Sequence, residues 1–145
     1  MKKTNQICVS QNLYELKPEM GNNFEVSSIK KEEALYRLVG GRLTSVQFIL
    51  NYLILGFDDK GALTTLVWPE IHREGGKVII FGTQGYRDEL CFLIEKATRN
   101  LAIDADETIS IEFENGTELR IPLQSYKVPG ERAVLTGPQH YLFVF

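Results

Sequence analysis

One short segment near the middle of the chain holds the densest set of side chains that could do chemistry. Residues 68–74 contain the only tryptophan, one of the two histidines, two glutamates and an arginine. Glu70 and His72 are two positions apart, so in a strand both would point to the same face and could form a general acid–base pair. With two residues that follow Gly85, they define a hypothetical small-molecule pocket. Its residues are Trp68, Glu70, His72, Tyr86 and Arg87. The alternative interpretation is a polar connector whose tryptophan packs at the edge of the core.

No catalytic or cofactor motif accompanies this segment. The chain has no nucleophile motif, phosphate loop or zinc-ligand spacing, so we expect no catalytic residue, no metal and no cofactor. Cys8 and Cys91 are far apart, which predicts unpaired and mostly buried thiols. Gly85 precedes a predicted helix, whose N-terminus could hold an anion. Asp88 and Glu89 in its first turn would repel that anion and would stabilise the helix dipole instead.

Acidic residues are concentrated in the second half of the chain. From Asp88 to Glu118 there are nine acids and two bases, a net charge of −7, whereas the whole chain has −3. Within residues 109–114 the alternation of side chains directs the apolar ones inward and the carboxylates outward. We therefore expect a docking surface for a basic protein partner. Its residues are Asp104, Asp106, Glu107, Glu112, Glu114 and Glu118. The alternative is that these acids maintain solubility and prevent edge-to-edge strand pairing.

Composition also argues against two classes of partner. The acidic segment would repel phosphates, and no basic stripe interleaved with aromatic residues exists, so nucleic acid is not expected as a partner. No segment approaches the roughly 20 apolar residues that a membrane-spanning helix needs. The start resembles a signal peptide, yet no apolar stretch of sufficient length follows residues 1–3. We therefore expect a cytoplasmic protein without a membrane partner.

The elements that must position these side chains recur along the chain. Residues 35–39 correspond to residues 90–94 at an offset of 55, and residues 53–57 correspond to residues 109–113 at an offset of 56. Each copy begins with a helix bearing an apolar stripe and continues with three strands. Helices are expected at about residues 29–39 and 86–96. Strands are expected at residues 7–9, 46–50, 53–57, 63–67, 77–81, 101–103, 109–113, 118–123 and 141–145.

These elements predict an α+β fold. We expect a single domain over residues 1–145, made of two pseudo-symmetric α-β-β-β repeats at about residues 28–81 and 82–145, with mainly antiparallel sheet and two helices. The outward positions of the first repeat are apolar or uncharged: Ile54, Gly56, Thr64 and Leu66. A terminal strand or a second copy of the chain would cover that face, so a structural homodimer is a further hypothesis.

One stretch of the chain, residues 85–96, resembles a sequence found in a known family. It begins Gly-Tyr-Arg-Asp-Glu-Leu-Cys-Phe-Leu-Ile. Together with residues 45–48 and 68–69 upstream, it resembles a family of small bacterial two-repeat α+β proteins. The resemblance covers residues 35–123 and implies no activity and no catalytic residue. Small acidic α+β proteins of this size are also similar to the immunity proteins that neutralise bacterial toxins. That similarity implies a non-catalytic inhibitor that masks a basic partner such as a nuclease toxin.

Overall fold

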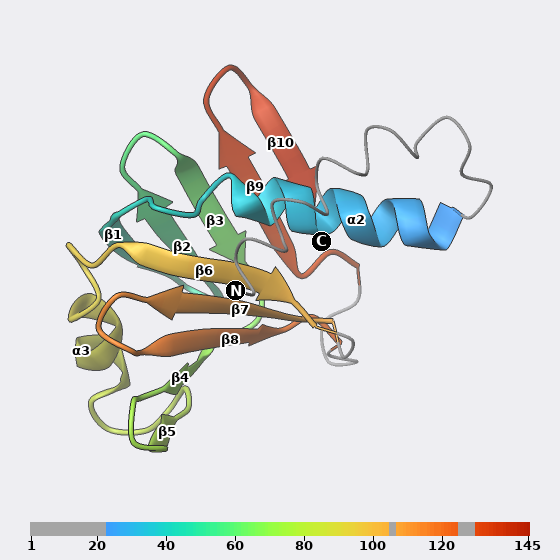
Figure 1. The fold of residues 1–145 in the computed structure, drawn as a ribbon. Coiled ribbons are helices and arrows are strands. Elements are labelled where there is room, and N and C mark those ends of the chain that lie inside the picture. The colour runs from blue at the N-terminus through green and yellow to red at the C-terminus, as the bar shows by residue number, and fades with distance from the viewer. Residues whose placement is uncertain (1–22, 105–106, 125–129) are drawn as a thin grey trace.

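The protein has an α+β fold with two antiparallel sheets of five strands each (Figure 1). The computed structural model describes residues 23–104, 107–124 and 130–145. The predicted fold class is confirmed. The strand expected at residues 7–9 lies outside the described residues.

The first sheet combines a three-stranded meander with a C-terminal hairpin. Its strands, in spatial order, are β1 (Leu43–Ile49), β2 (Tyr52–Phe57), β3 (Gly61–Thr65), β9 (Ala133–Gly137) and β10 (Tyr141–Val144). The two C-terminal strands, β9 and β10, therefore extend this sheet sideways and do not cover its outer face. β10 is one of the two edge strands, and Leu142 is 61% exposed there.

The second sheet combines the other meander with a short hairpin from the middle of the chain. Its strands, in spatial order, are β5 (Val78–Ile79), β4 (Glu70–His72), β8 (Glu118–Pro122), β7 (Thr108–Phe113) and β6 (Thr98–Ile103). Strands on both sides of the predicted repeat boundary thus join the sheet of the other half. Sequence patterns did not predict β4 or β9. Each pairs on one side with the next strand along the chain, but on the other side with a strand far away in the sequence, β8 for β4 and β3 for β9.

The two helices differ from their predicted extents. Helix α2 (Asn23–Tyr36) begins before Ser27, and a turn then leads to Gly40 at φ 85°. Helix α3 (Tyr86–Cys91) is much shorter than the predicted residues 86–96. The chain leaves α3 through tight turns and reaches Glu95 at φ 79°, whose N–H donates to the carbonyl of Leu43 at 2.7 Å. Pairing with the start of β1 therefore ends this helix early.

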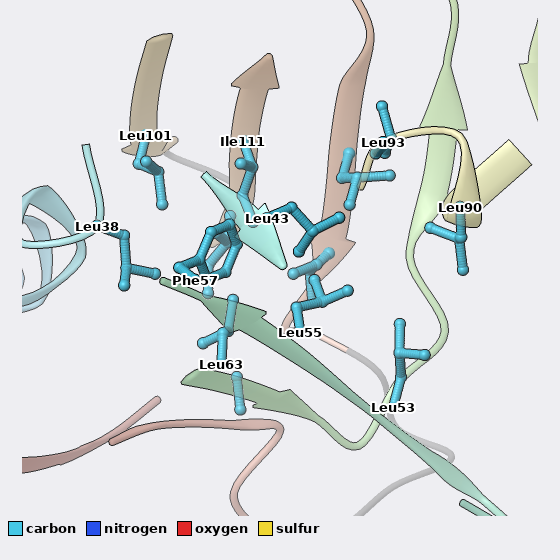
Figure 2. Close-up of a cluster of buried hydrophobic side chains, with 14 of the residues drawn as sticks. Leu38, Leu43, Leu53, Leu55, Phe57, Leu63, Leu90, Leu93, Leu101 and Ile111 are labelled. Atoms are coloured by element: carbon cyan, nitrogen blue, oxygen red, sulfur yellow. The ribbon is translucent and has the colours of Figure 1, made fainter. Parts of the chain in front are cut away.

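One continuous core lies between the two sheets. Figure 2 shows side chains from both sheets, from α3 and from the turn after α2 meeting there, among them Leu55, Ile111, Leu90 and Leu38. Phe57 and Phe113 are fully buried at equivalent ends of β2 and β7. Complete burial of each such side chain contributes about 1.5–3 kcal/mol. The core therefore holds together the surfaces on which the candidate sites lie.

The two meanders share hydrogen-bond details across the predicted offset. Gly40 and Glu95, which correspond at an offset of 55, both have positive φ. The N–H of Gly40 donates to the carbonyl of Thr98 at 3.0 Å, and the N–H of Glu95 donates in the same way to Leu43. The helices are nevertheless unequal, with 14 residues in α2 and 6 in α3. Duplication of an ancestral unit stays a prediction.

Candidate functional site: a charged sheet face and a neighbouring hollow

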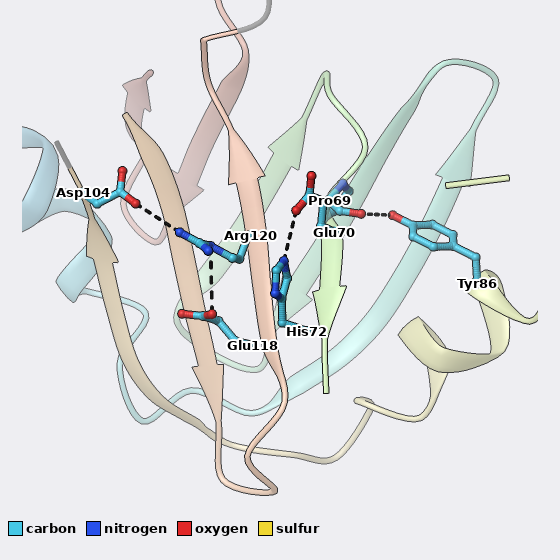
Figure 3. Close-up of polar contacts among 7 residues, drawn as sticks. All are labelled: Pro69, Glu70, His72, Tyr86, Asp104, Glu118 and Arg120. Atoms are coloured by element: carbon cyan, nitrogen blue, oxygen red, sulfur yellow. Dashed lines mark hydrogen bonds and ion pairs between the residues drawn. The ribbon is translucent and has the colours of Figure 1, made fainter. Parts of the chain in front are cut away.

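The outer face of the second sheet carries a grid of polar side chains (Figure 3). Strand register places Glu118 of β8 between Glu112 of β7 and His72 of β4. The same register places Arg120 opposite Glu70. The predicted alternation in β7 and β8 is confirmed, since the intervening apolar residues are buried. The unpredicted strand β4 brings the Glu70–His72 pair onto the same surface as the predicted carboxylates.

Arg120 is the central cation of this face. Its Nη2 lies 3.3 Å from Oδ2 of Asp104, and its Nε lies 4.0 Å from Oε1 of Glu118. A second arginine, Arg99, has its Nη1 3.6 Å from Oε2 of Glu112. All these groups are partly exposed, and each such pair contributes about 0–1 kcal/mol. The pairs orient the carboxylates without removing them from water.

Glu70 and His72 form a contact of their own. Nε2 of His72 lies 3.0 Å from Oε1 of Glu70, with both side chains partly exposed. The predicted sharing of one strand face by these two residues is therefore confirmed. Figure 3 shows the pair beside the Arg120 cluster on neighbouring strands. Among the described residues, no serine, threonine or cysteine side chain has a hydrogen bond to His72.

The other predicted carboxylates lie at the two ends of the sheet. Glu107 precedes β7 and lies 3.8 Å from Nζ of Lys31 in α2. Glu114 lies at the opposite end, where its Oε2 accepts the N–H of Ala97 at 3.0 Å. Asp106 lies outside the described residues. The predicted docking surface is thus an extended face rather than a compact cluster.

Acids outnumber cations on and around this face. Its described carboxylates are Glu70, Asp104, Glu107, Glu112, Glu114 and Glu118. The permanent cations paired with them are Lys31, Arg99 and Arg120. The excess gives the face a negative potential, which attracts cationic surfaces over a distance set by the ionic strength.

The predicted small-molecule pocket is divided by the structure. Tyr86 and Arg87 line an open hollow of about 440 Å³ formed by residues 81–88. Trp68 lies beside that hollow, with its ring stacked on Phe81 at 4.1 Å between centroids. Glu70 and His72 belong instead to the outer sheet face. The five predicted residues are thus divided between the hollow and the outer sheet face, and a small-molecule site that uses them stays a prediction.

Tyr86 connects the hollow to the strand that carries Glu70. Its ring is buried, and its hydroxyl donates to the carbonyl of Pro69 at 2.5 Å (Figure 3). Burial raises the pKa of the Tyr86 hydroxyl, and the negative charge of Glu70 raises this pKa further. Tyr86 is therefore a neutral hydrogen-bond donor that holds α3 against the chain before β4.

The structure also bears on the Cys91 thiol, on clusters that could bind a metal and on helices that could cross a membrane. Cys91 is exposed, so the prediction of a buried thiol is wrong for this residue; the last turn of the short α3 leaves its side chain in solvent. Within the described ranges, no three His, Cys, Asp or Glu side chains are grouped to hold a metal ion. No helix in the same ranges has the length and apolar character needed to cross a membrane.

Two residues that matter for these surfaces were missed by the sequence patterns. Arg120 was not among the predicted site residues, because its role as the central cation depends on the register of β8 with its neighbours. Phe81 ends an apolar run just before Gly82, and it stays 44% exposed. An apolar residue immediately before a glycine turn was the one local signal that could have singled it out.

Comparisons with known proteins add no assignment for either surface. The chain matches no protein-family model, no curated protein and no solved structure. The resemblance to small bacterial two-repeat proteins and to immunity proteins therefore stays a prediction.

Proposed function

We propose that the protein is a non-catalytic binding protein that masks a basic surface on a protein partner, in the manner of an immunity protein against a nuclease-type toxin. The observation that supports this proposal most is the outer face of the second sheet. There β7 and β8 place Glu112 and Glu118 side by side, while Asp104 and Glu70 lie on either side of Arg120. The proposed place of action is the cytoplasm.

The geometry of the face suits recognition of a cationic surface. Its carboxylates are partly exposed and held by weak pairs with arginines, so a partner's Lys or Arg side chains could compete for them. The arginines would meanwhile contact acidic groups at the rim of the partner. Such complementarity accelerates association and suppresses wrong partners more than it raises affinity. Binding should therefore weaken steeply as salt is added.

A charge-reversal variant tests the proposal. The chain is tagged and used to capture proteins from lysate of the source organism at low and moderate salt, with mass spectrometry of the eluate. We expect a stoichiometric basic protein that is lost as salt rises. The double variant Glu112→Lys/Glu118→Lys should lose it at low salt, whereas Asp59→Lys/Glu131→Lys, at exposed residues outside the charged face, is a matched control that should retain it. Equal capture by the two variants would refute the proposal.

A structural homodimer is the second candidate, and it rests on a different surface. The outer face of the first sheet presents no charged side chain along β2, β3, β9 or β10. Ile54 of β2 and Val134 of β9 lie on either side of Thr64 of β3, and Val144 of β10 lies opposite Val134. Exposed apolar side chains on such a face favour self-association. Sedimentation equilibrium over a wide concentration range tests this candidate. A monomer at the highest concentration would exclude it.

A further inference from the structure

A row of aromatic side chains ends at the hollow formed by residues 81–88. The ring of Trp68 lies between Phe48, at 6.5 Å, and Phe81, at 4.1 Å, and is nearly parallel to Phe81 with an interplanar angle of 7°. Tyr86 meets Phe81 at 5.7 Å in an edge-to-face arrangement. Phe81 is thus held by two rings and yet remains 44% exposed at the wall of the hollow.

An exposed and immobilised aromatic ring is costly to leave in water and favourable for stacking. Phe81 needs no reordering to accept a planar group, because its neighbours already hold it. Aromatic pairs contribute about 0.5–1.5 kcal/mol beyond the area that they bury. The hollow measures about 440 Å³, which lies within the usual range for small-ligand sites. Its wall therefore favours a ligand that contains an aromatic ring.

Two side chains of opposite charge line the same hollow. Arg87 and Asp88 are both exposed, and neither has an ion pair among the described residues. The guanidinium of Arg87 has one ring contact, 5.8 Å from the centroid of Phe48. The adjacent Glu89, by contrast, is bound by Arg73 at 3.1 Å. Arg87 would attract a simple anion and Asp88 would repel it. A simple cation would be attracted by Asp88 and repelled by Arg87.

We infer that this hollow binds a small aromatic zwitterion of the class of free aromatic α-amino acids. The aromatic ring stacks on Phe81, the carboxylate pairs with Arg87 and the ammonium pairs with Asp88. The side chains of Thr83 and Gln84, which also line the hollow, supply further hydrogen-bonding groups. This site is separate from the charged face of the second sheet, so it can stand or fall independently of the proposed function.

A ligand series on the unmodified full chain tests the inference. Phenylalanine is titrated against isotope-labelled protein, and the amide signals of residues 82–87 are followed by NMR. We expect saturable shifts with a dissociation constant on the order of 1 mM. Phenylpropionate lacks the ammonium and phenylethylamine lacks the carboxylate, so each should bind about fivefold more weakly. Alanine lacks the ring and should give no saturable shift.

Three variants assign each part of the ligand to its side chain. Phe81→Leu keeps an apolar residue but removes the aromatic face, and it should weaken phenylalanine binding about two- to tenfold. The Arg87→Gln variant should bind phenylalanine no more tightly than it binds phenylethylamine. The Asp88→Asn variant should bind phenylalanine no more tightly than it binds phenylpropionate. Phe92→Leu, at a residue that is 70% exposed outside the hollow, is the matched control and should bind normally.

Three results would refute parts or all of the inferred amino-acid site. Absence of saturable shifts with phenylalanine would remove the site. Equal binding of phenylalanine, phenylpropionate and phenylethylamine would remove the zwitterion class. Unchanged binding in Phe81→Leu would remove the stacking wall.

Discussion

Glu112 and Glu118 lie directly opposite each other on strands β7 and β8, with both carboxylates on the outer face of the second sheet. Like charges in this position destabilise a strand pair by a few tenths of a kcal/mol. Arg99 lies 3.6 Å from Glu112, and Arg120 lies 4.0 Å from Glu118, so each carboxylate has its own cation. The two arginines therefore offset the repulsion between the two glutamates.

Removing the central cation should expose this repulsion. Arg120→Gln leaves Glu118, Asp104 and the opposite Glu70 without their shared positive charge. We expect the free energy of unfolding to fall by about 1 kcal/mol at low salt, and by less at high salt because the repulsion is screened. Urea denaturation at two salt concentrations measures both values. Arg42→Gln, at an exposed residue at the start of β1, is the control. A loss that is the same at both salt concentrations would contradict the electrostatic origin.

A buried threonine joins the two meanders through its hydroxyl. Oγ1 of Thr98 donates to the carbonyl of Leu38 at 2.7 Å and lies 3.1 Å from the carbonyl of Gly41. Thr98→Val keeps the shape but leaves these carbonyls without that donor, so we expect a loss of about 1–2 kcal/mol in the free energy of unfolding. Thr64→Val on the outer face of β3 is the matched control. If the two variants were equally stable, the Thr98 hydroxyl would have no structural role.

Tyr86 predicts a pH dependence of stability. Burial, and then the charge of Glu70, raise the pKa of its hydroxyl in the folded protein. The unfolded chain therefore loses this proton first, and the free energy of unfolding falls as pH rises past the ordinary tyrosine pKa of about 10. At neutral pH, Tyr86→Phe should cost about 1 kcal/mol through the lost bond to Pro69.

Denaturation of the wild-type protein and of Tyr86→Phe at neutral and alkaline pH tests this dependence. The difference in stability between them should shrink as the pH passes about 10, because the variant has no proton to lose at this position. Glu70→Gln should shrink the alkaline loss in part, since it removes the second cause of the raised pKa. A difference between wild type and Tyr86→Phe that does not change with pH would contradict the prediction.

Two glycines with positive φ should respond very differently to alanine. Gly61 begins β3 at φ 127°, and a Cβ there would lie 2.1 Å from the carbonyl oxygen of Thr136 in β9. Gly61→Ala should therefore cost more than about 3 kcal/mol, because strain and a backbone clash add together. Gly82 has φ 95° with nothing within 4 Å of its Cβ position, so Gly82→Ala should cost about 1–2 kcal/mol. Thermal unfolding of both variants measures the contrast, and equal losses would show that the β3–β9 approach is not tight.

Much of the fold was predictable because it depends on neighbours along the chain. Alternation placed Ile109 and Ile111 inward and Glu112 outward. The hairpin between β7 and β8 turns at Asn115–Gly116, where Gly116 has a φ of 87°. An apolar stripe predicted a helix at about residues 29–39, but α2 spans Asn23–Tyr36, so it begins earlier than predicted and ends before Leu38. These features follow from the periods of strands and helices, which a sequence displays directly.

The sequence by itself determined the α+β class, the two meanders and the outward direction of their carboxylates. Only the tertiary structure decided that β4 joins β8 and that β9 joins β3, since neither pairing leaves a local signal. The pairing of β4 with β8 placed Glu70 and His72 on the charged face, while the charge of Glu70 still acts on Tyr86. The hollow with Phe81, Arg87 and Asp88 is instead a local feature, since consecutive residues 81–88 line it. Side-chain periodicity is local, whereas the choice of strand partners depends on burial of the shared core.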